Sequence, residues 1–314
     1  MNENLKFQSK RQTNQFLFSD MSHILKNKNL EIKIDLPLEN YNFSRFDWTG
    51  KIVDVKFHNI QLATVERTDG QNEDSFGKGF YNEFGIDTAL GFDETETGGW
   101  FHKIGVGLLK KENSQYLFSK NYEVKPAEFK ISAESDRILI RCKSQVANGY
   151  AYLLRKEIQI AESGFILKYH LQNTGEKDII TDEYGHNFTS INNDLIGNKY
   201  VLKFPFQLKP GLFGETVNPE LKVEIGQNEI KFKGTPDAQF FFSNLSGNEN
   251  INAGWQLINL ESKIGISESG SFQTNKVNLW GWKHVICPEL FFKINIKPGQ
   301  SVEWSRNYRV LKLD

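Results

Sequence analysis

Cysteine is scarce in this sequence. The 314 residues include only two, Cys142 and Cys287, and they lie far apart in the chain. Two cysteines exclude a disulfide framework of the kind that stabilises small secreted domains, and they are too few for a zinc ribbon. A disulfide between them is one alternative, but we favour two reduced thiols at strand positions.

Long apolar runs and an excess of charge are missing as well. Residues 1–20 hold no apolar stretch long enough for a signal peptide, and no segment reaches the roughly 20 apolar residues of a transmembrane helix. Lysine and arginine total 38 against 39 aspartate and glutamate residues, so the net charge of −1 favours neither nucleic acid nor an acidic membrane as a partner. Unless a leader was removed, we expect a cytoplasmic protein that acts as a monomer or a weak homodimer.

The common catalytic signatures are absent too. The sequence has no phosphate-binding P-loop, no Gly-x-Gly-x-x-Gly, no Gly-x-Ser-x-Gly and no His-Glu-x-x-His. Its six histidines show no metal-ligand spacing. We therefore expect no metal and no cofactor, and the enzyme classes that remain use acid–base chemistry by histidine and carboxylate side chains.

Apolar residues in a two-residue period are the dominant feature. Hydrophobic residues make up 39% of the chain and aromatic residues 13%, enough for a large core. Apolar and polar side chains alternate along 51–58 and along 31–36. Residues 221–225 and 229–233 are predicted to form a hairpin around a turn that starts at Gly226. Further strands are predicted at 137–146, 151–160, 164–173, 254–260, 263–268 and 290–297.

Helical periodicity is nearly absent, apart from one short amphipathic segment at 19–27 that predicts a helix. Strands that run almost end to end, without blade-like repeats or a linker, predict an all-β chain. We expect one large two-sheet β-sandwich domain over residues 1–314. Residues 1–30 would form an N-terminal extension that packs on this sandwich or precedes it.

One irregular stretch, residues 66–103, interrupts the alternation. It mixes glycines with aromatic residues and carboxylates. Long irregular segments inside compact β domains are usually functional. The composition suits a sugar cleft, because rings stack on the apolar faces of sugars while polar groups bind the hydroxyls. A long surface loop with its own small core explains the composition equally well.

Two segments carry residues suited to acid–base chemistry. Residues 181–190 read TDEYGHNFTS and place His186 near the middle of the chain. Residues 277–290 read VNLWGWKHVICPEL and place Glu289 before an amphipathic strand that leads to Pro298-Gly-Gln-Ser.

This order of segments resembles the galactose mutarotase (aldose 1-epimerase) family and its hexose-6-phosphate mutarotase relatives, over roughly residues 40–312. Residues 45–55, RFDWTGKIVDV, are similar to the strand pair that opens the family's sequences. The family's typical Asn-Arg-Ile and Asn-His-Leu-His-Gly segments are not present as such, which is typical of a divergent branch. The resemblance implies a galactose mutarotase-like supersandwich. It also implies an aldose 1-epimerase-like isomerase, which interconverts the α and β anomers of a free sugar.

By this resemblance Glu289 is the base that takes the proton of the anomeric hydroxyl, and His186 is the acid at the ring oxygen. Glu289 also has support of its own. Pro288 fixes the backbone before it, and its neighbours are apolar, so partial burial would raise the pKa of its carboxyl group toward neutrality. A Glu that points into water at a strand start, and a histidine with a structural role in a turn, are the alternatives.

Cationic and aromatic residues are candidates for holding the sugar. They are Arg45, Arg67, His102, Lys103, Trp100 and Trp280. The cations could bind hydroxyls or an anionic group, although each alone is also an ordinary surface or capping residue. The tryptophans could stack on a sugar or pack in the core. If Arg45 or Lys103 points into the pocket, a uronic or phosphorylated sugar becomes attractive.

Two other kinds of function stay open. A non-catalytic carbohydrate-binding protein would use the same scaffold, since one fold hosts many functions. A glycoside hydrolase would need two carboxylates flanking the cleft, and a polysaccharide lyase would need a Tyr or His base with cationic neutralisers. Candidate carboxylates within 66–103 are Glu83, Asp87, Asp93, Glu94 and Glu96.

Overall fold

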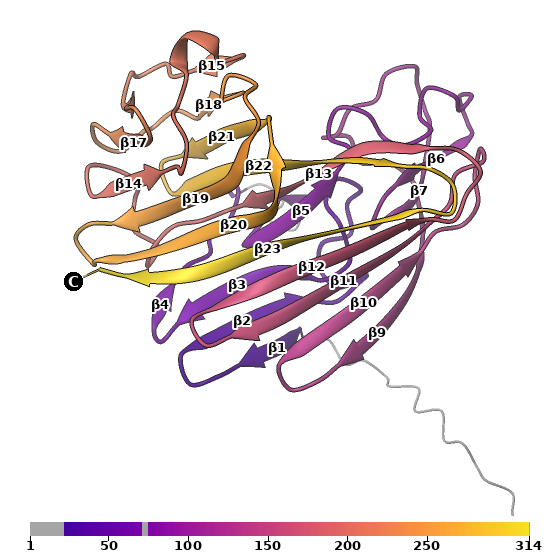
Figure 1. Ribbon diagram of the computed structural model, residues 1–314, viewed down its shortest axis with the longest axis horizontal. Helices are drawn as coiled ribbons and strands as arrows, with labels where there is room; N and C mark the ends of the chain where they lie inside the picture. The colour runs from indigo at the N-terminus through magenta and orange to yellow at the C-terminus, as the bar shows by residue number, and fades with distance from the viewer. Residues whose placement is uncertain (1–21, 71–74, 314) are drawn as a thin grey trace, which may run out of the picture.

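The computed structural model describes residues 22–70 and 75–313. Within these residues the chain is built almost entirely of β-strands. They form two ten-stranded sheets and one three-stranded sheet, in which paired strands run antiparallel (Figure 1). The prediction of an all-β chain with two large sheets is confirmed.

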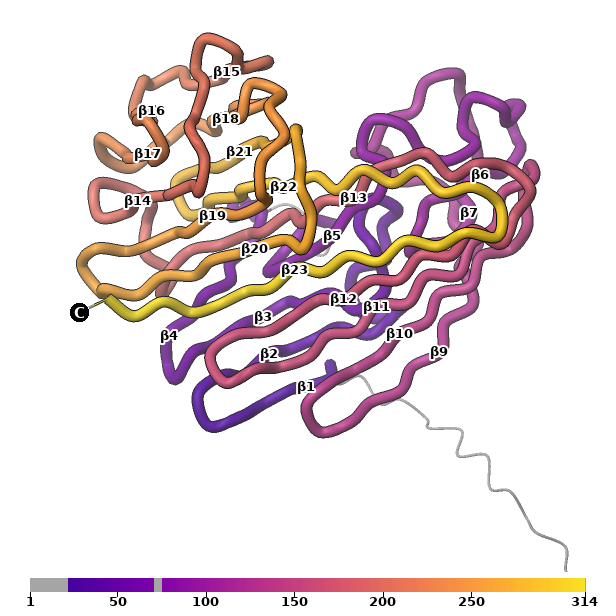
Figure 2. The backbone as a smooth tube through the Cα atoms, viewed as in Figure 1, coloured from indigo at the N-terminus to yellow at the C-terminus, as the bar shows by residue number. Residues whose placement is uncertain are grey.

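The first sheet has the strand order β1-β2-β3-β5-β13-β22-β21-β18-β15, with β4 paired to β3. Its strands are β1 (His23–Lys26), β2 (Leu30–Asp35), β3 (Lys51–Phe57), β4 (Ile60–Gln61), β5 (Phe80–Phe84), β13 (Ile179–Asn187), β15 (Thr216–Val217), β18 (Phe240–Phe242), β21 (Val277–Trp282) and β22 (Val285–Ile296). At its centre β13 lies between β5 and β22, two strands that are far apart in the sequence, as their colours in Figure 2 show.

The second sheet has the order β16-β17-β14-β19-β20-β23-β12-β11-β10-β9. Its strands are β9 (Glu128–Ala133), β10 (Arg137–Lys143), β11 (Tyr152–Ala161), β12 (Gly164–Asn173), β14 (Tyr200–Lys203), β16 (Val223–Ile225), β17 (Glu229–Phe232), β19 (Ile251–Asn259), β20 (Ile264–Thr274) and β23 (Ser301–Lys312). The hairpin predicted around Gly226 is confirmed, because β16 and β17 pair Val223 with Phe232.

The remaining elements are small. The third sheet consists of β6 (Trp100–Lys103), β7 (Gly107–Lys110) and β8 (Val124–Pro126), and a 3-10 turn, η2, spans Pro210–Leu212. In the described part of the chain, no helix has the length and apolar character needed to cross a membrane.

The two large sheets enclose one extensive apolar core. Ile52 and Phe80 from the first sheet and Leu154 and Leu167 from the second belong to it, and each is at most 1% exposed. Burial of apolar surface stabilises such a core by about 25 cal/mol per Å². Cys142 in β10 and Cys287 in β22 are both buried and free, as predicted. That the whole chain folds as one domain stays a prediction.

Charged side chains are also buried between the sheets. Arg306 in β23 donates to Glu183 in β13 at 2.7 Å and to Glu268 in β20 at 2.6 Å. All three residues are at most 2% exposed. A buried charge without a partner is strongly destabilising, so this triad is stable only with all three members in place. It locks β13, at the centre of the first sheet, onto the second sheet.

Two predictions of local structure are wrong. The described part of the segment 19–27 contains strand β1, which pairs with β2, and not a helix; residues 19–21 lie outside the described residues. The stretch 66–103, predicted to be irregular, contains β5 and β6. Every residue of β5 is buried, so its sequence FYNEF shows none of the alternation that marks a half-exposed strand.

Candidate functional site

The outer face of the first sheet, which points away from the large core, carries the candidate site. Side chains alternate between the two faces along a strand. Phe80 and Leu290 belong to the core between the sheets, whereas Tyr81 and Cys287 belong to a second apolar cluster on the opposite face. Counting by two from Cys287 places Glu289 on that same outer face.

Strand register brings His186 and Glu289 together. The ladder of β13 and β22 runs in one register up to the pair of Tyr184 and Phe291. The same register resumes at an isolated bridge three residues beyond His186. His186 therefore stands opposite Glu289, and side chains at opposite positions of antiparallel strands are direct neighbours.

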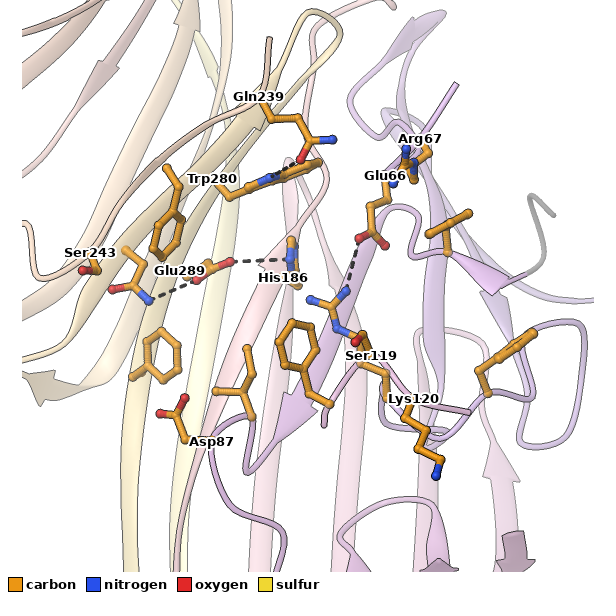
Figure 3. Close-up of a pocket in the computed structure, with 18 of the residues that line it drawn as sticks. Glu66, Arg67, Asp87, Ser119, Lys120, His186, Gln239, Ser243, Trp280 and Glu289 are labelled. Carbon is orange, nitrogen blue, oxygen red and sulfur yellow. Dashed lines mark hydrogen bonds and ion pairs between the residues drawn. The ribbon is translucent and has the colours of Figure 1, made fainter. Parts of the chain in front are cut away.

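The two side chains face each other and are almost fully buried. His186 Nε2 and Glu289 Oε1 lie 3.5 Å apart, and the residues are 4% and 5% exposed (Figure 3). Asn278, which pairs with Glu289 across β21 and β22, donates from Nδ2 to the other carboxylate oxygen at 3.4 Å. An imidazole and a carboxylate thus form a row with an amide on one face of the sheet.

An asparagine on the inner face joins the backbones of these two strands. Asn187 follows His186, and its Nδ2 donates to the carbonyl oxygen of Pro288, the residue before Glu289, at 3.1 Å. The same amide donates to the buried Glu268 at 2.8 Å. The backbone ladder of β13 and β22 is interrupted at this point, so the asparagine side chain bridges the gap.

Aromatic rings surround the imidazole of His186. The ring of Phe188 stacks on it at 4.3 Å, and the rings of Phe46 and Trp280 meet it edge-on at 5.8 and 5.9 Å. Its Nδ1 contacts Sγ of Cys287. Burial, together with the nearby charge of Arg45, holds the pKa of His186 well below its usual value of 6.5, so the imidazole on its own is neutral at pH 7.

The carboxyl group of Glu289 is shifted in the opposite direction. Burial raises its pKa from 4.5 to about 7, although the charge of Arg45 and the hydrogen bond from Asn278 lower it in part. Because the two groups touch, they titrate as a pair that shares protons. The pair therefore holds one proton below about pH 7 and loses it as the pH rises through that value. In the one-proton state it can pass protons in both directions.

The pair borders a cavity of about 750 Å³, a usual size for a small-molecule site. Aromatic rings and side-chain amides make up much of its wall. They are Tyr41, Phe43, Phe76, Phe118, Phe241, Trp280 and Phe291, with Asn121, Gln239, Asn244 and Asn278. Rings that present flat apolar faces beside amides that donate and accept hydrogen bonds match the two kinds of surface on a sugar.

Arg45 also lines the cavity. Its Nε donates to Glu83 and its Nη1 to Glu66, each at 3.1 Å. Glu83 is fully buried and also accepts from Lys103 at 3.0 Å. The guanidinium group is therefore held rigidly by two carboxylates. In Figure 3 Glu66 and Glu289 flank His186 from opposite sides.

Three of the six predicted sugar-binding residues line the cavity: Arg45, Arg67 and Trp280. Arg67 forms an ion pair with Asp69 near the rim. The indole Nε1 of Trp280 donates to Gln239 at 3.3 Å, which orients the ring beside His186. The structure brings these three residues into one cavity with the His–Glu pair.

The other three, Trp100, His102 and Lys103, do not line the cavity, so the structure does not bring them together with the His–Glu pair. They form β6 in the third sheet. His102 is 1% exposed and its Nε2 lies 3.1 Å from the backbone oxygen of Tyr150. Lys103 is buried against Glu83. The ring of Trp100 is half-buried, and the ammonium group of Lys125 lies over it. Their part in a site is at most indirect.

The carboxylates considered for a hydrolase are also dispersed. Of the five, only Asp87 lines the cavity. Glu83 is buried behind it under Arg45, and Glu94 is bound to Tyr150 and Lys177 elsewhere. Asp87 is thus the one of the five that shares the cavity with Glu289.

Sequence reasoning missed four lining residues: Glu66, Gln239, Asn244 and Asn278. Glu66, Gln239 and Asn278 form hydrogen bonds with charged or aromatic side chains of the site. Asn278 could have been found, because it precedes Trp280 by two residues and so shares its face of the strand. Gln239 and Asn244 flank the short apolar strand β18, and nothing local marks them.

No group of three or more His, Cys, Asp or Glu side chains in residues 22–70 and 75–313 is placed to hold a metal ion. The cavity instead holds two ionisable groups in contact on neighbouring strands, the imidazole of His186 and the carboxyl group of Glu289. Such a pair can remove a proton from one atom of a ligand and deliver a proton to another atom close by.

Comparison with known proteins identifies the fold. No family model matches the sequence, and no curated protein matches it. Solved structures do match, at low identity. A protein from Synechocystis superimposes with a TM-score of 0.60 at 12% identity, covering 99% of this chain and 100% of the other. A galactose mutarotase related enzyme from Lactobacillus acidophilus gives 0.59 at 12% identity, covering 93% and 100%. A galactose mutarotase-like protein from Lactobacillus casei gives 0.55 at 12% identity, covering 92% and 99%.

These matches span nearly the whole of the chains compared, so the chain has the galactose mutarotase-like fold that the resemblance of its segments predicted. Identities near 12% are those of a divergent sequence.

Proposed function

We propose that this protein, with its galactose mutarotase-like fold, is an aldose 1-epimerase-like isomerase that interconverts the α and β anomers of a free sugar. One observation carries the proposal: His186 and Glu289 face each other 3.5 Å apart, nearly buried, at the wall of a cavity of about 750 Å³. The anomeric hydroxyl oxygen and the ring oxygen are both attached to C1. An acid and a base that serve them must therefore lie side by side.

The reaction needs only proton transfers. Glu289, as carboxylate, takes the proton of the hydroxyl on C1, while His186, protonated at Nε2, gives its proton to the ring oxygen. The bond between C1 and the ring oxygen breaks, its electron pair stays on that oxygen, and C1 becomes an aldehyde. After rotation about the bond between C1 and C2, the same steps in reverse close the ring on the other face of C1. General acid–base catalysis of this kind contributes about 10²–10⁴-fold in rate.

The resting site keeps this proton on Glu289, because burial lowers the pKa of His186 and raises that of Glu289. The two placements of the proton differ only by a transfer across the gap between the side chains. Each placement has one group that accepts and one that donates, so the pair is competent when it holds one proton in total.

The rest of the cavity supports a sugar as the partner. Trp280 and Phe291 present rings to the cavity that the pair borders, and Asn278 donates to the carboxylate of Glu289. A non-catalytic sugar-binding protein would use the same walls. Such a binding protein would not need an imidazole and a carboxyl group buried in contact, because burying two ionisable groups lowers stability.

Exchange NMR of the two anomers tests the proposal. A panel of freshly dissolved neutral hexoses, pentoses, uronic acids and hexose phosphates is measured with the wild type, with Glu289→Gln and with buffer alone. We expect acceleration of at least one class by the wild type and loss of that acceleration in the variant. Absence of acceleration for every sugar, together with binding of one of them, would establish the non-catalytic alternative.

A further inference from the structure

We infer that the cavity is built for an uncharged sugar and that Glu66 and Asp87 exclude sugars that carry a phosphate or carboxylate group. This inference rests on the proposed function. Its basis is the pairing of every cation that lines the cavity with carboxylates of the same chain.

The most deeply placed cation is already neutralised. Arg45 donates to Glu66 and Glu83 at 3.1 Å each, and its side chain is only 17% exposed. Behind it Lys103 binds Glu83 at 3.0 Å. Two cations and two carboxylates therefore cancel next to the His–Glu pair. An anionic group that entered here would meet no excess positive charge, because Glu66 and Glu83 already balance Arg45 and Lys103.

The cations nearer the rim are paired as well. Lys276 Nζ lies 2.9 Å from Asp87 and 3.7 Å from Asp182, and it covers the ring of Phe291 at 4.0 Å. Arg67 binds Asp69. Lys120 binds Glu112 at 2.5 Å. Thus each lysine and arginine in the described lining lies within 4 Å of at least one carboxylate.

Apart from Glu289, which carries the proton of the His–Glu pair at rest, the lining holds three carboxylates and four cations. The carboxylates are Glu66, Asp87 and Glu215, and the cations are Arg45, Arg67, Lys120 and Lys276. Two of the cations, Arg67 and Lys120, pair with Asp69 and Glu112 outside the lining. Recognition of a phosphate normally uses cations whose charge is not already matched, often in bidentate contact. Hydroxyl groups, in contrast, donate well to carboxylates and exchange hydrogen bonds with amides such as Asn278 and Gln239. The charge pattern thus fits a neutral aldose.

Removing the negative partners should relax this selectivity. Glu66→Gln leaves Arg45 with one carboxylate, and Asp87→Asn leaves Lys276 with the more distant Asp182. We expect each variant to raise the ratio of kcat/KM for an anionic sugar over a neutral one by about tenfold, the effect of one well-placed charge contact of about 1.4 kcal/mol. Asp87 is 73% exposed, so its variant should fold even if Glu66→Gln, which also loses a bond from Gly77, does not.

The matched control is Glu261→Gln. It makes the same change of net charge at a side chain that is 76% exposed, lies outside the cavity lining and pairs with Lys199. Its ratio should equal that of the wild type.

The closing experiment measures anomer exchange by NMR for glucose, galactose, xylose, glucuronate and glucose 6-phosphate with the wild type and the three variants, each corrected for the buffer rate. The expected result is a wild-type kcat/KM at least tenfold higher for a neutral sugar than for either anion. This preference should decrease in Glu66→Gln and in Asp87→Asn, and it should stay at the wild-type value in Glu261→Gln. A wild type that prefers an anionic sugar overturns the inference and leaves the isomerase intact. Variants that behave like Glu261→Gln overturn the assigned role of the two carboxylates. No exchange with any sugar, neutral or anionic, is instead the failure of the proposed function.

Discussion

Glu289→Gln should make the protein inactive and at the same time more stable at alkaline pH. The substitution keeps the size of the side chain and its place beside Asn278, but it removes the ionisable group. Burial raises the pKa of this carboxyl from 4.5 to about 7. Keeping an ionised carboxylate in a buried functional site lowers the free energy of unfolding, and a neutral glutamine side chain at the same place restores that stability.

The sign and size follow from proton linkage. A carboxyl group with a raised pKa binds its proton more tightly in the folded protein than in the unfolded chain. Its contribution to stability is therefore fully present below pH 4.5 and is lost as the pH rises through about 7. A rise from 4.5 to about 7 corresponds to about 3 kcal/mol at alkaline pH, and to about 1 kcal/mol or less at pH 5. The glutamine variant lacks this pH-dependent loss.

Urea unfolding, followed by tryptophan fluorescence at pH 5 and pH 8.5, measures the difference. We expect the advantage of Glu289→Gln over the wild type in unfolding free energy to be larger at pH 8.5 by about 2–3 kcal/mol. Glu261→Gln, which alters an exposed carboxylate, should show no such dependence. An equal difference at both pH values, or a variant that is less stable at pH 8.5, would falsify the assignment of Glu289 as a buried, desolvated acid.

Three further outcomes are expected. If the pair acts with one proton, kcat/KM for the neutral sugar should fall as the pH rises through about 7, where the pair loses that proton. A kcat/KM that increases over this pH range would contradict the shared-proton mechanism. Asn187→Ala removes the side-chain link between β13 and β22, so kcat should fall at least tenfold while KM stays within about twofold of the wild-type value. A raised KM with unchanged kcat would instead mean a binding role. An unchanged kcat would mean that Asn187 does not position the pair. Trp280→Ala should raise KM, with kcat changed less, by the loss of about 1–2 kcal/mol of ring contact; an unaffected KM in the exchange assay would place the sugar elsewhere in the cavity.

The strands with one exposed face could be predicted from the sequence. In β3, β11 and β12 apolar side chains point into the core at every second position, and the two-residue period is visible without the fold. β5 could not be predicted in the same way, since both of its faces are covered and its sequence carries no period. The sequence around the short β1 is compatible with a helix, because four residues are too few to distinguish the helical period from the strand period. The pairing of β1 with β2 decides its structure.

The site divides along the same line. Local sequence determined which residues could act: a histidine and a glutamate in two segments that resemble a known family, and an arginine and a tryptophan as candidate sugar-binding residues. It also determined the all-β chain that holds them. Whether these residues meet is a matter of long-range strand register. That register sets His186 opposite Glu289. The packing of other segments places Arg45 and Trp280 at the same cavity and leaves His102 on another sheet. The tertiary structure alone decided the charge of the cavity, because Glu66, Glu83 and Asp87 neutralise cations that come from other strands and loops. Charges that are distant in the chain interact only once the fold has brought them within a few ångströms.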